Sequence, residues 1–264
     1  MDRRPIGVFD SGLGGLTAVR ELMRLLPHED IIYFGDTGRV PYGTRSRETI
    51  LRYTRQDIAF LTGFSIKALV VACGTASSVA LPTIKDYYDF PILGVVKSAA
   101  VRAAEATKNG KIGVIGTRAT IQSGAFDREL SDFSLSSIVC PLFVPLVENG
   151  RVTPSDPVLK LVIEEYLTPL RERSIDTLIL GCTHYPIIAE AIANFLPGVT
   201  LINPGFEAIR TLSLRGDFMQ NPAGTGSCHF YVSDDPEGFS QNASLFLGRP
   251  VEGLVSQVAI EEYL

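Results

Sequence analysis

Several features that mark other protein classes are scarce or missing from this chain of 264 residues. It has 24 Lys and Arg against 29 Asp and Glu, a net charge of -5, so a basic surface for nucleic acid is not expected. No uninterrupted apolar stretch is long enough to span a membrane. The residues before the first expected strand also lack the apolar segment of a signal peptide. We therefore expect a cytoplasmic protein that contacts neither nucleic acid nor membrane.

Cysteine is also scarce. Four cysteines in a chain of this length are too few for a disulfide scaffold, and reduced thiols are the expectation. No C-x-x-C spacing is present, which argues against the common redox and zinc motifs. Cys182 and His184 alone do not supply the three or four ligands of a zinc site. A redox disulfide between Cys73 and Cys182 stays open as an alternative, but no motif supports it.

Two of the four cysteines stand at matching places in the sequence. Cys73 closes the apolar run 68–72, and Cys182 closes the run 177–181. Each run has the length and β-branched content of a buried strand, and a helical pattern follows each cysteine. Open α/β sheets bind ligands at such strand ends, and the dipole of the next helix favours a thiolate there. The pattern predicts two thiols that act on one substrate from opposite sides.

The two cysteine strands belong to a longer repeat. An Ile-Gly-Val strand opens at residue 6 and another at residue 112, and the interval from Gly7 to Cys73 nearly equals that from Gly113 to Cys182. Ordinary reuse of such strands in α/β proteins is the alternative to a duplicated architecture. Strands alternate with helices throughout, which predicts an α/β fold with mainly parallel sheets covered by helices. We expect two similar domains related by a pseudo-twofold axis, residues 1–95 plus about 208–264 and residues 96–207, with the active site in the cleft between them.

The coarse pattern also gives element boundaries. Strands are expected at 6–9, 31–34, 68–72, 92–95, 112–116, 177–181 and 229–232. Helices are expected from the glycine-rich turn to about 26, at 46–64, from Cys73 to about 88, and at 99–106, 123–130, 157–173 and 237–246. The helix at 157–173 is expected to be interrupted near Pro169, and Pro186 suits the first turn of the helix that follows the Cys182 strand. Residues 141–150, which include Glu148, are expected to form a loop.

A glycine-rich stretch, residues 10–15, follows the first strand. It is not a dinucleotide-binding loop, because the G-x-G-x-x-G pattern would need glycine at Thr17. Its backbone amides can still approach a small carboxylate at the start of a helix. A tight turn without a ligand is the alternative. Asp10 favours ligand binding, because an acidic residue at the carboxyl end of a strand often faces the cleft in α/β folds.

Taken together, these segments resemble the cofactor-independent glutamate racemases of the aspartate/glutamate racemase superfamily. The resemblance runs from about residue 5 to about residue 232 in the family's order. Each motif alone is weak, and jointly they are highly specific. The matching segments are residues 9–15, 35–37, 40–43, 72–73, 75–77, 141–142, Glu148 and 181–186.

The resemblance implies racemisation by two thiols. One thiolate removes the α-hydrogen of an amino acid and the other thiol returns a proton to the opposite face, with the roles exchanged in reverse. By resemblance Cys73 faces the D-enantiomer and Cys182 serves the other. Asp10, Glu148 and His184 resemble the groups that tune the two thiols, an imidazolium favouring the thiolate and a buried carboxylate holding the imidazole. No pyridoxal phosphate, other cofactor or metal is implied, and a homodimer is the family's common arrangement.

The resemblance also assigns residues to the substrate. Ser11, Tyr42 and Gly43 resemble those that hold the side-chain carboxylate. Thr75, Thr117 and Thr183 resemble those around the α-carboxylate and amino group. The further substrate contacts expected are Asp10, Pro41, Gly74, Thr120 and His184.

One departure from the family bears on binding. The usual Ala-Cys-Asn-Thr-Ala is here Ala-Cys-Gly-Thr-Ala, with glycine at position 74. A hydrogen bond to a charged group contributes about 1.5–3 kcal/mol, so Gly74→Asn is expected to raise kcat/KM about ten- to a hundredfold. A pocket closed over the glycine, or a different acid as substrate, would give other outcomes.

Three functions follow from these observations. The first is a glutamate racemase that supplies D-glutamate for peptidoglycan. The second is a related racemase that acts on aspartate or a hydantoin, and the third is an amino-acid-binding protein that has lost activity with the asparagine. Both cysteines, Asp10, Glu148 and His184 are retained, which argues against the third, and the segment 41–43 matches the glutamate enzymes.

Overall fold

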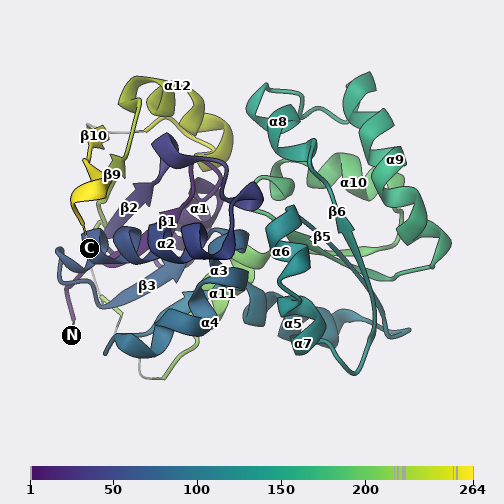
Figure 1. Ribbon diagram of the computed structural model, residues 1–264, viewed down its shortest axis with the longest axis horizontal. Coiled ribbons are helices and arrows are strands. Elements are labelled where there is room, and N and C mark those ends of the chain that lie inside the picture. Colours follow the sequence, from purple (N-terminus) through teal and green to yellow (C-terminus); the bar gives the residue numbers. More distant parts are fainter. Residues whose placement is uncertain are drawn as a thin grey trace.

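Two sheets of parallel strands, each flanked by helices, make up the protein in its computed structural model, which describes residues 2–216, 218, 220–221, 224–251, 253 and 255–263 (Figure 1). The first sheet has the order β10-β9-β2-β1-β3-β4 and the second has the order β6-β5-β7-β8. Figure 1 shows the yellow C-terminal segment returning to the first sheet. The strands of the first sheet are β1 (Ile6–Asp10), β2 (Ile31–Gly35), β3 (Ala68–Val71), β4 (Ile92–Gly94), β9 (Cys228–Val232) and β10 (Val255–Gln257). Those of the second are β5 (Lys111–Gly116), β6 (Ser134–Val139), β7 (Thr177–Gly181) and β8 (Thr200–Ile202).

The two sheets share one strand order. β1 pairs with β2 and β3, and β3 pairs with β4, all in parallel. In the second sheet β5 pairs with β6 and β7, and β7 pairs with β8, again in parallel. The expected α/β class, with two similar halves and parallel sheets, is confirmed. The domain boundaries at residues 95 and 208 stay a prediction.

Helices cover the faces of both sheets. Ser46 caps the helix that follows it, because its hydroxyl accepts the amide of Thr49 at 3.3 Å. No helix within the described part of the chain combines the length and the apolar character needed to cross a membrane. The helices are α1 (Leu16–Leu25), α2 (Arg47–Thr62), α3 (Gly74–Val79), α4 (Leu81–Ile84), α5 (Val95–Ala106), α6 (Arg118–Gln122), α7 (Ala125–Glu129), α8 (Phe143–Glu148), α9 (Pro157–Glu172), α10 (Ala189–Phe195), α11 (Pro204–Ser213) and α12 (Pro236–Leu247).

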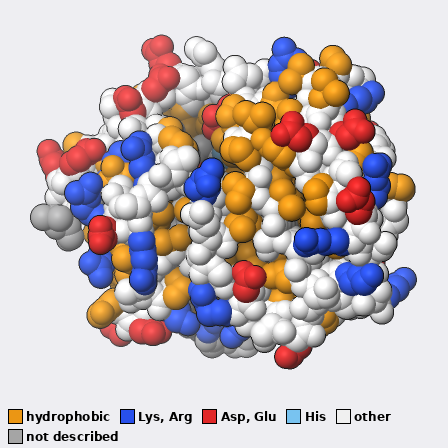
Figure 2. All heavy atoms as spheres, turned by 45° about the vertical axis from the view of Figure 1, so that its right-hand side comes forward, with side chains coloured by type: hydrophobic (Ala, Val, Ile, Leu, Met, Phe, Trp, Pro, Cys, Tyr) orange, Lys and Arg blue, Asp and Glu red, His pale blue; other side chains and the backbone are white. Residues whose placement is uncertain are grey.

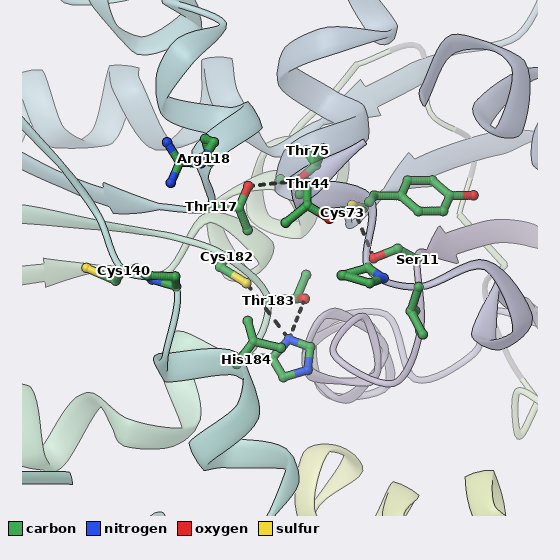
Figure 3. Close-up of a pocket in the computed structure, with 18 of the residues that line it drawn as sticks. Ser11, Thr44, Cys73, Thr75, Thr117, Arg118, Cys140, Cys182, Thr183 and His184 are labelled. Atoms are coloured by element: carbon green, nitrogen blue, oxygen red, sulfur yellow. Dashed lines mark hydrogen bonds between the residues drawn. The ribbon is translucent and has the colours of Figure 1, made fainter. Parts of the chain in front are cut away.

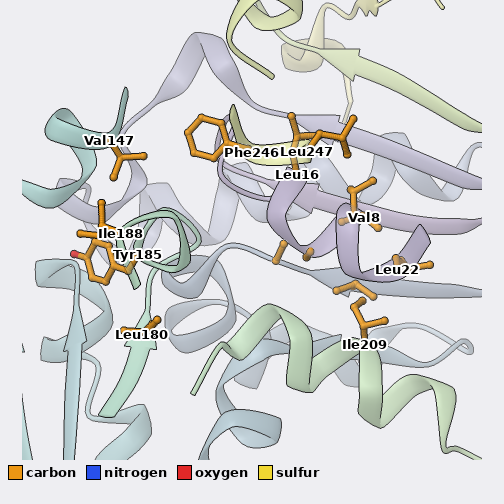
Figure 4. Close-up of a cluster of buried hydrophobic side chains, with 14 of the residues drawn as sticks. Val8, Leu16, Leu22, Val147, Leu180, Tyr185, Ile188, Ile209, Phe246 and Leu247 are labelled. Carbon is orange, nitrogen blue, oxygen red and sulfur yellow. The ribbon is translucent and has the colours of Figure 1, made fainter. Parts of the chain in front are cut away.

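The central strands are mostly apolar because they are buried on both faces. Every residue of β1 is buried, and alternate side chains enter different clusters. Val8 joins one cluster with Leu16, whereas Phe9 joins another with Phe34. The first of these clusters also reaches the second sheet, through residues such as Leu180 (Figure 4). One hydrophobic core therefore ties the two sheets together.

The segment after β6 differs from expectation. Residues 143–148 form α8 instead of lying in a loop. Phe143 and Val147, one helical turn apart, are both fully buried, and this packing supplies the driving force. Pro145 is tolerated because it lies in the first turn, where its missing amide hydrogen would have no partner. Glu148 is therefore presented from the end of a helix.

Other boundaries were also wrong. α9 runs without a break to Glu172, because Pro169 lies near its end and the buried Leu167 and Leu170 keep packing on either side of it. The helix expected from Cys73 to about 88 is divided into α3, α4 and a short 3-10 turn. Pro186 lies in a 3-10 turn, Tyr185–Ile188, that leads into α10. The sequence pattern missed α6, the strand β6 and the short strands β8 and β10, and α5 begins directly after β4.

Candidate active site

A pocket of about 320 Å³ opens between the two sheets (Figure 3). Its walls are the loops that follow β1, β2 and β3 on one side and β5, β6 and β7 on the other. All these strands end at the pocket because the sheets are parallel, and this is where α/β sheets bind ligands. Figure 2 shows a hollow beside surface hydrophobic side chains, and Val40 and Leu142 are large apolar side chains exposed beside the pocket. The sequence-predicted residues that line the pocket are Ser11, Pro41, Tyr42, Gly43, Cys73, Gly74, Thr75, Thr117, Glu148, Cys182, Thr183 and His184.

The two thiols lie on opposite sides of this pocket (Figure 3). Cys73 caps α3, where its sulfur accepts the amide of Ala76 at 3.5 Å and donates to the Ser11 hydroxyl at 3.5 Å. Cys182 follows β7, and its sulfur lies 3.8 Å from Nδ1 of His184. β3 and β7 occupy the same position in their sheets, so the two cysteines are placed by equivalent elements.

The surroundings of Cys73 favour the protonated thiol. Burial raises its pKa to about 12, the nearby Asp10 charge adds to this, and the Ala76 amide and Ser11 oppose it. The start of α3 does favour the thiolate, as expected, through the Ala76 amide, but burial outweighs this and keeps Cys73 a thiol. Desolvation of a buried thiolate outweighs one amide at a helix start.

The surroundings of Cys182 are different. His184 places Nδ1 toward Cys182 and Nε2 2.9 Å from a carboxylate oxygen of Glu148. Burial lowers the His184 pKa, but its hydrogen bonds to Cys182 and Glu148 outweigh this and raise the pKa to about 10. The edge of the ring packs against Phe246 of α12, with 5.2 Å between ring centroids. At neutral pH an imidazolium thus stands beside Cys182. Its partner Glu148 is not the buried carboxylate that the sequence suggested, since its side chain is 45% exposed.

Two predicted site residues lie behind the pocket wall. Asp10 is buried, accepts the Gly12 amide at 3.1 Å and lies 3.5 Å from the Thr183 hydroxyl. Burial raises the Asp10 pKa, while His184 opposes this. Thr120 is also buried, with its hydroxyl 3.0 Å from that of Thr117. Neither side chain lines the pocket, so each can act on a ligand only through its neighbours.

The Tyr42 hydroxyl is turned away from the pocket. It donates to Asp36 and lies 2.8 Å from Oδ2 of Asp57, inside the first half of the molecule. What Tyr42 offers a ligand is therefore its backbone, together with the backbone of Gly43. The expectation that these residues hold a carboxylate is compatible with this geometry only through their amides.

Hydroxyl groups meet across the pocket from both sheets. The Thr75 hydroxyl lies 2.9 Å from that of Thr117, and Thr183 adds a third hydroxyl to the wall. Sequence reasoning missed Arg118, which lines the pocket and forms no ion pair with any described residue. In the sequence, the signal that could have indicated Arg118 as a pocket residue was its position directly after Thr117. These groups together suit a small ligand with carboxylates.

The remaining cysteines have packing roles. Cys140 is buried in the core cluster that ties the two sheets together, and its carbonyl accepts the Tyr185 hydroxyl at 2.9 Å. Cys228 is half-buried in β9 against the same cluster. Cys140 also lines the pocket, whereas Cys228 does not. The other lining residues are Gly12, Val40, Thr44, Pro141, Val144, Pro145 and Gly181.

At Gly74 the geometry favours the alternative of a pocket closed over the glycine. A Cβ atom at position 74 would lie 2.5 Å from the carbonyl oxygen of Gly181, which belongs to the opposite sheet. Such a contact needs a backbone to move, because ordinary contacts begin near 3.4 Å. Glycine at this position lets the starts of α3 and of the loop after β7 approach closely. An asparagine side chain does not fit without a shift of one sheet against the other.

We predict that Gly74→Ala and Gly74→Asn lower kcat/KM for glutamate, by about tenfold for alanine and more for asparagine. The added atoms push Cys73 away from Cys182, and a misplacement near 1 Å costs up to about a hundredfold. Steady-state kinetics with Gly216→Ala as the control checks this, because a Cβ at 216 meets nothing within 4 Å. A rise in kcat/KM for Gly74→Asn would restore the expectation drawn from the sequence.

Comparison with known proteins agrees with this site. The family model described as Asp/Glu/Hydantoin racemase matches residues 15–212. A glutamate racemase from Geobacter metallireducens is 43% identical over 269 residues, covering 99% of this chain and 98% of the relative. The crystal structure of Francisella tularensis glutamate racemase in complex with D-glutamate has a TM-score of 0.91 at 38% identity and covers 100% of both chains. That of the Thermus thermophilus glutamate racemase in complex with β-chloro-D-alanine has a TM-score of 0.90 at 44% identity, over 98% of each chain. The chain therefore belongs to the Asp/Glu/Hydantoin racemase family and, within it, groups with the glutamate racemases.

Proposed function

We propose that this protein interconverts L- and D-glutamate by proton transfer between the substrate α-carbon and two thiols. The observation that carries the proposal is the placement of Cys73 and Cys182 at equivalent strand ends on opposite sides of one pocket. The kinship with glutamate racemases supports the choice of substrate.

The protonated His184 and the buried Cys73 thiol suit the L-to-D direction. Cys182, beside the His184 imidazolium, acts as the thiolate and removes the α-hydrogen, so that a C–H bond breaks as an S–H bond forms. Cys73, held as a thiol by burial, gives its proton to the opposite face of the carbanion. The enzyme is left with Cys73 as the thiolate, which is the form that accepts the D-enantiomer.

The polar groups of the pocket fit glutamate better than an uncharged hydantoin. Arg118 and His184 supply positive charge, and Glu148, the acidic side chain on the wall, is already hydrogen-bonded to His184. We assign the α-carboxylate and amino group to the hydroxyls of Thr75, Thr117 and Thr183. We assign the side-chain carboxylate to the Ser11 hydroxyl and the backbone amides of Tyr42 and Gly43.

The physiological setting is also a proposal. D-Glutamate made by this reaction would enter peptidoglycan, which places the enzyme in the cytoplasm of a bacterium. We propose a homodimer, and a reaction that needs no metal or organic cofactor. No three His, Cys, Asp or Glu side chains are grouped as a metal site within the ranges that the structure describes.

Circular dichroism of the reaction mixture tests the function. Dialysed, chelator-treated protein is incubated separately with L-glutamate, D-glutamate, L-aspartate and a hydantoin. We expect the signals of both glutamate enantiomers to decay to zero without added pyridoxal phosphate, nucleotide or metal. An absolute requirement for one of these additions, or decay with aspartate or hydantoin alone, would reject the proposal.

A further inference from the structure

A buried polar cluster lies beneath the loop of residues 40–44. We name it the loop-anchor cluster and define it as Asp36, Arg39, Tyr42, Asp57 and Ser233. Nε of Arg39 donates to Asp36 Oδ2 at 2.7 Å, and Nη2 donates to Asp57 Oδ1 at 2.9 Å. Ser233 donates to the other oxygen of Asp36 at 2.8 Å. Both aspartates are fully buried, and Arg39 and Tyr42 are nearly so.

The Tyr42 hydroxyl contacts both carboxyl groups. It donates to Oδ2 of Asp36, and its oxygen lies 2.8 Å from Oδ2 of Asp57. A phenol has one hydrogen and can donate to only one of these oxygens. If both aspartates were ionised, the second contact would bring two acceptors together with no hydrogen between them, in a region without water-accessible surface. One of the two carboxyl groups must therefore carry a proton.

The donor count identifies which aspartate is protonated. Asp36 accepts from Arg39, Ser233 and Tyr42, which is the environment of a carboxylate. Asp57 meets one donor besides the tyrosine, the Nη2 group of Arg39, among the residues that the structure describes. A neutral Asp57 also balances the charge, because Arg39 is then paired with Asp36 alone. Buried charges that lack such a balance are strongly disfavoured.

We propose that Asp57 is a protonated acid that donates to the Tyr42 hydroxyl and so positions the loop 40–44 for substrate. The chain of hydrogen bonds then runs in one direction, from Asp57 to Tyr42 and from Tyr42 to Asp36. Asp57 is a positioning residue, because it lies outside the pocket and acts through Tyr42. The part of the inference that concerns substrate rests on the proposed function.

The loop has two contacts that depend on this anchor. Residues 40–44 all line the pocket, and Thr44 is among the residues drawn there in Figure 3. Gly43 also packs against the opposite sheet, since a Cβ at this position would lie 2.7 Å from Cβ of Thr117. A loop that is fixed from below by the Tyr42 hydroxyl can hold its backbone amides at one distance from a carboxylate. Without the anchor, those amides are free to move.

Electrostatics agree with the hydrogen count. The charged and titratable groups that face Asp57 are Asp36, Arg39 and Tyr42. Burial and the charge of Asp36 raise the pKa of Asp57 well above its usual value, and Arg39 and Tyr42 oppose this only in part. The other polar neighbours of the cluster, Gln56 on Arg39 and Ser233 on Asp36, carry no charge.

The pH dependence of unfolding tests the proton on Asp57. We compare the protein with Asp57→Asn, whose amide donates to Tyr42 and accepts from Arg39 as the protonated acid does. Above pH 4 the unfolded chain loses the Asp57 proton and the folded chain keeps it, so the unmodified protein loses stability with rising pH. We expect the unfolding equilibrium constant of the unmodified protein to rise relative to that of Asp57→Asn between pH 4 and 8, by up to about tenfold per pH unit. A shift in the opposite direction, or none, overturns the protonated state.

Kinetics test the positioning role separately. Asp57→Asn is expected to keep KM for glutamate within about threefold of the parent, whereas Asp57→Ala and Tyr42→Phe raise KM about tenfold with a smaller change in kcat. If Asp57→Ala does not fold, Tyr42→Phe tests the positioning role in its place. KM values equal to that of the parent in folded Asp57→Ala and Tyr42→Phe would overturn the positioning role. The unfolding comparison needs no substrate, so its outcome is independent of whether glutamate is turned over.

Discussion

Serine at position 73 or at position 182 is expected to reduce racemisation of glutamate by about 10²–10⁴-fold while leaving the protein folded. This is the range that a positioned general acid or base contributes. A hydroxyl is a far weaker acid than a thiol, so it neither forms the anion needed to remove the α-hydrogen nor returns a proton readily. Cys228→Ser is the matched control, because Cys228 lies in β9 and does not line the pocket.

Exchange of the α-hydrogen in D₂O separates the two thiols. In Cys73→Ser the Cys182 thiolate can still remove the hydrogen of L-glutamate and return deuterium to the same face. We therefore expect exchange from L-glutamate alone in Cys73→Ser and from D-glutamate alone in Cys182→Ser. NMR of the recovered substrate measures this for each enantiomer. Racemisation near the parent rate in either variant would exclude the two-thiol mechanism.

His184→Asn is expected to slow exchange from L-glutamate by about a hundredfold and exchange from D-glutamate by only a few-fold. The imidazolium lies 3.8 Å from the sulfur of Cys182, and a hydrogen bond to a charged group contributes about 1.5–3 kcal/mol, or roughly ten- to a hundredfold in rate. Cys73 has no imidazole beside it, since its sulfur contacts Ser11 and the Ala76 amide. Exchange from L-glutamate should therefore depend on His184 more strongly than exchange from D-glutamate.

The titration of His184 supplies an independent measurement. Its ring signals in NMR should titrate near pH 10 in the parent protein and at a lower pH in Cys182→Ser, because the hydrogen bond to Cys182 is the largest influence that raises the pKa. Glu148→Gln should lower it less, since the half-exposed Glu148 is screened by solvent. If His184→Asn slows exchange of the α-hydrogen equally for L-glutamate and D-glutamate, the assignment of His184 to Cys182 is contradicted.

Much of the fold could be predicted because its signals are local. A β-branched run that ends in a cysteine and is followed by a helical pattern marks a strand and a strand end without reference to any other part of the chain. Parallel pairing then brings the ends of β3 and β7 to one edge of their sheets, and Cys73 and Cys182 do line one pocket. The roles assigned to these residues stay predictions.

The features that could not be predicted depend on distant contacts. Gly74 faces Gly181, which is more than a hundred positions away, so no local pattern shows that an asparagine lacks room. The Tyr42 hydroxyl has the chemistry of a ligand-binding group, and its contact with Asp57 of α2 shows that it points into the protein instead. The six residues of α8 include a proline, so their local pattern predicts a loop, and the helix depends on the burial of Phe143.

The shared strand order of the two sheets has a consequence for chirality. A twofold rotation can superpose one half of the molecule on the other, but no rotation converts L-glutamate into D-glutamate, because these are mirror images. With two identical halves, glutamate could bind in two equivalent orientations related by that rotation, and either thiol could face the α-hydrogen of L-glutamate. The neighbours of the thiols differ between the halves, since Cys73 has Ser11 with Asp10 behind it and Cys182 has His184. A duplicated scaffold can supply two equivalent places for sulfur, and the unequal residues around them give each hand of the molecule its own thiol.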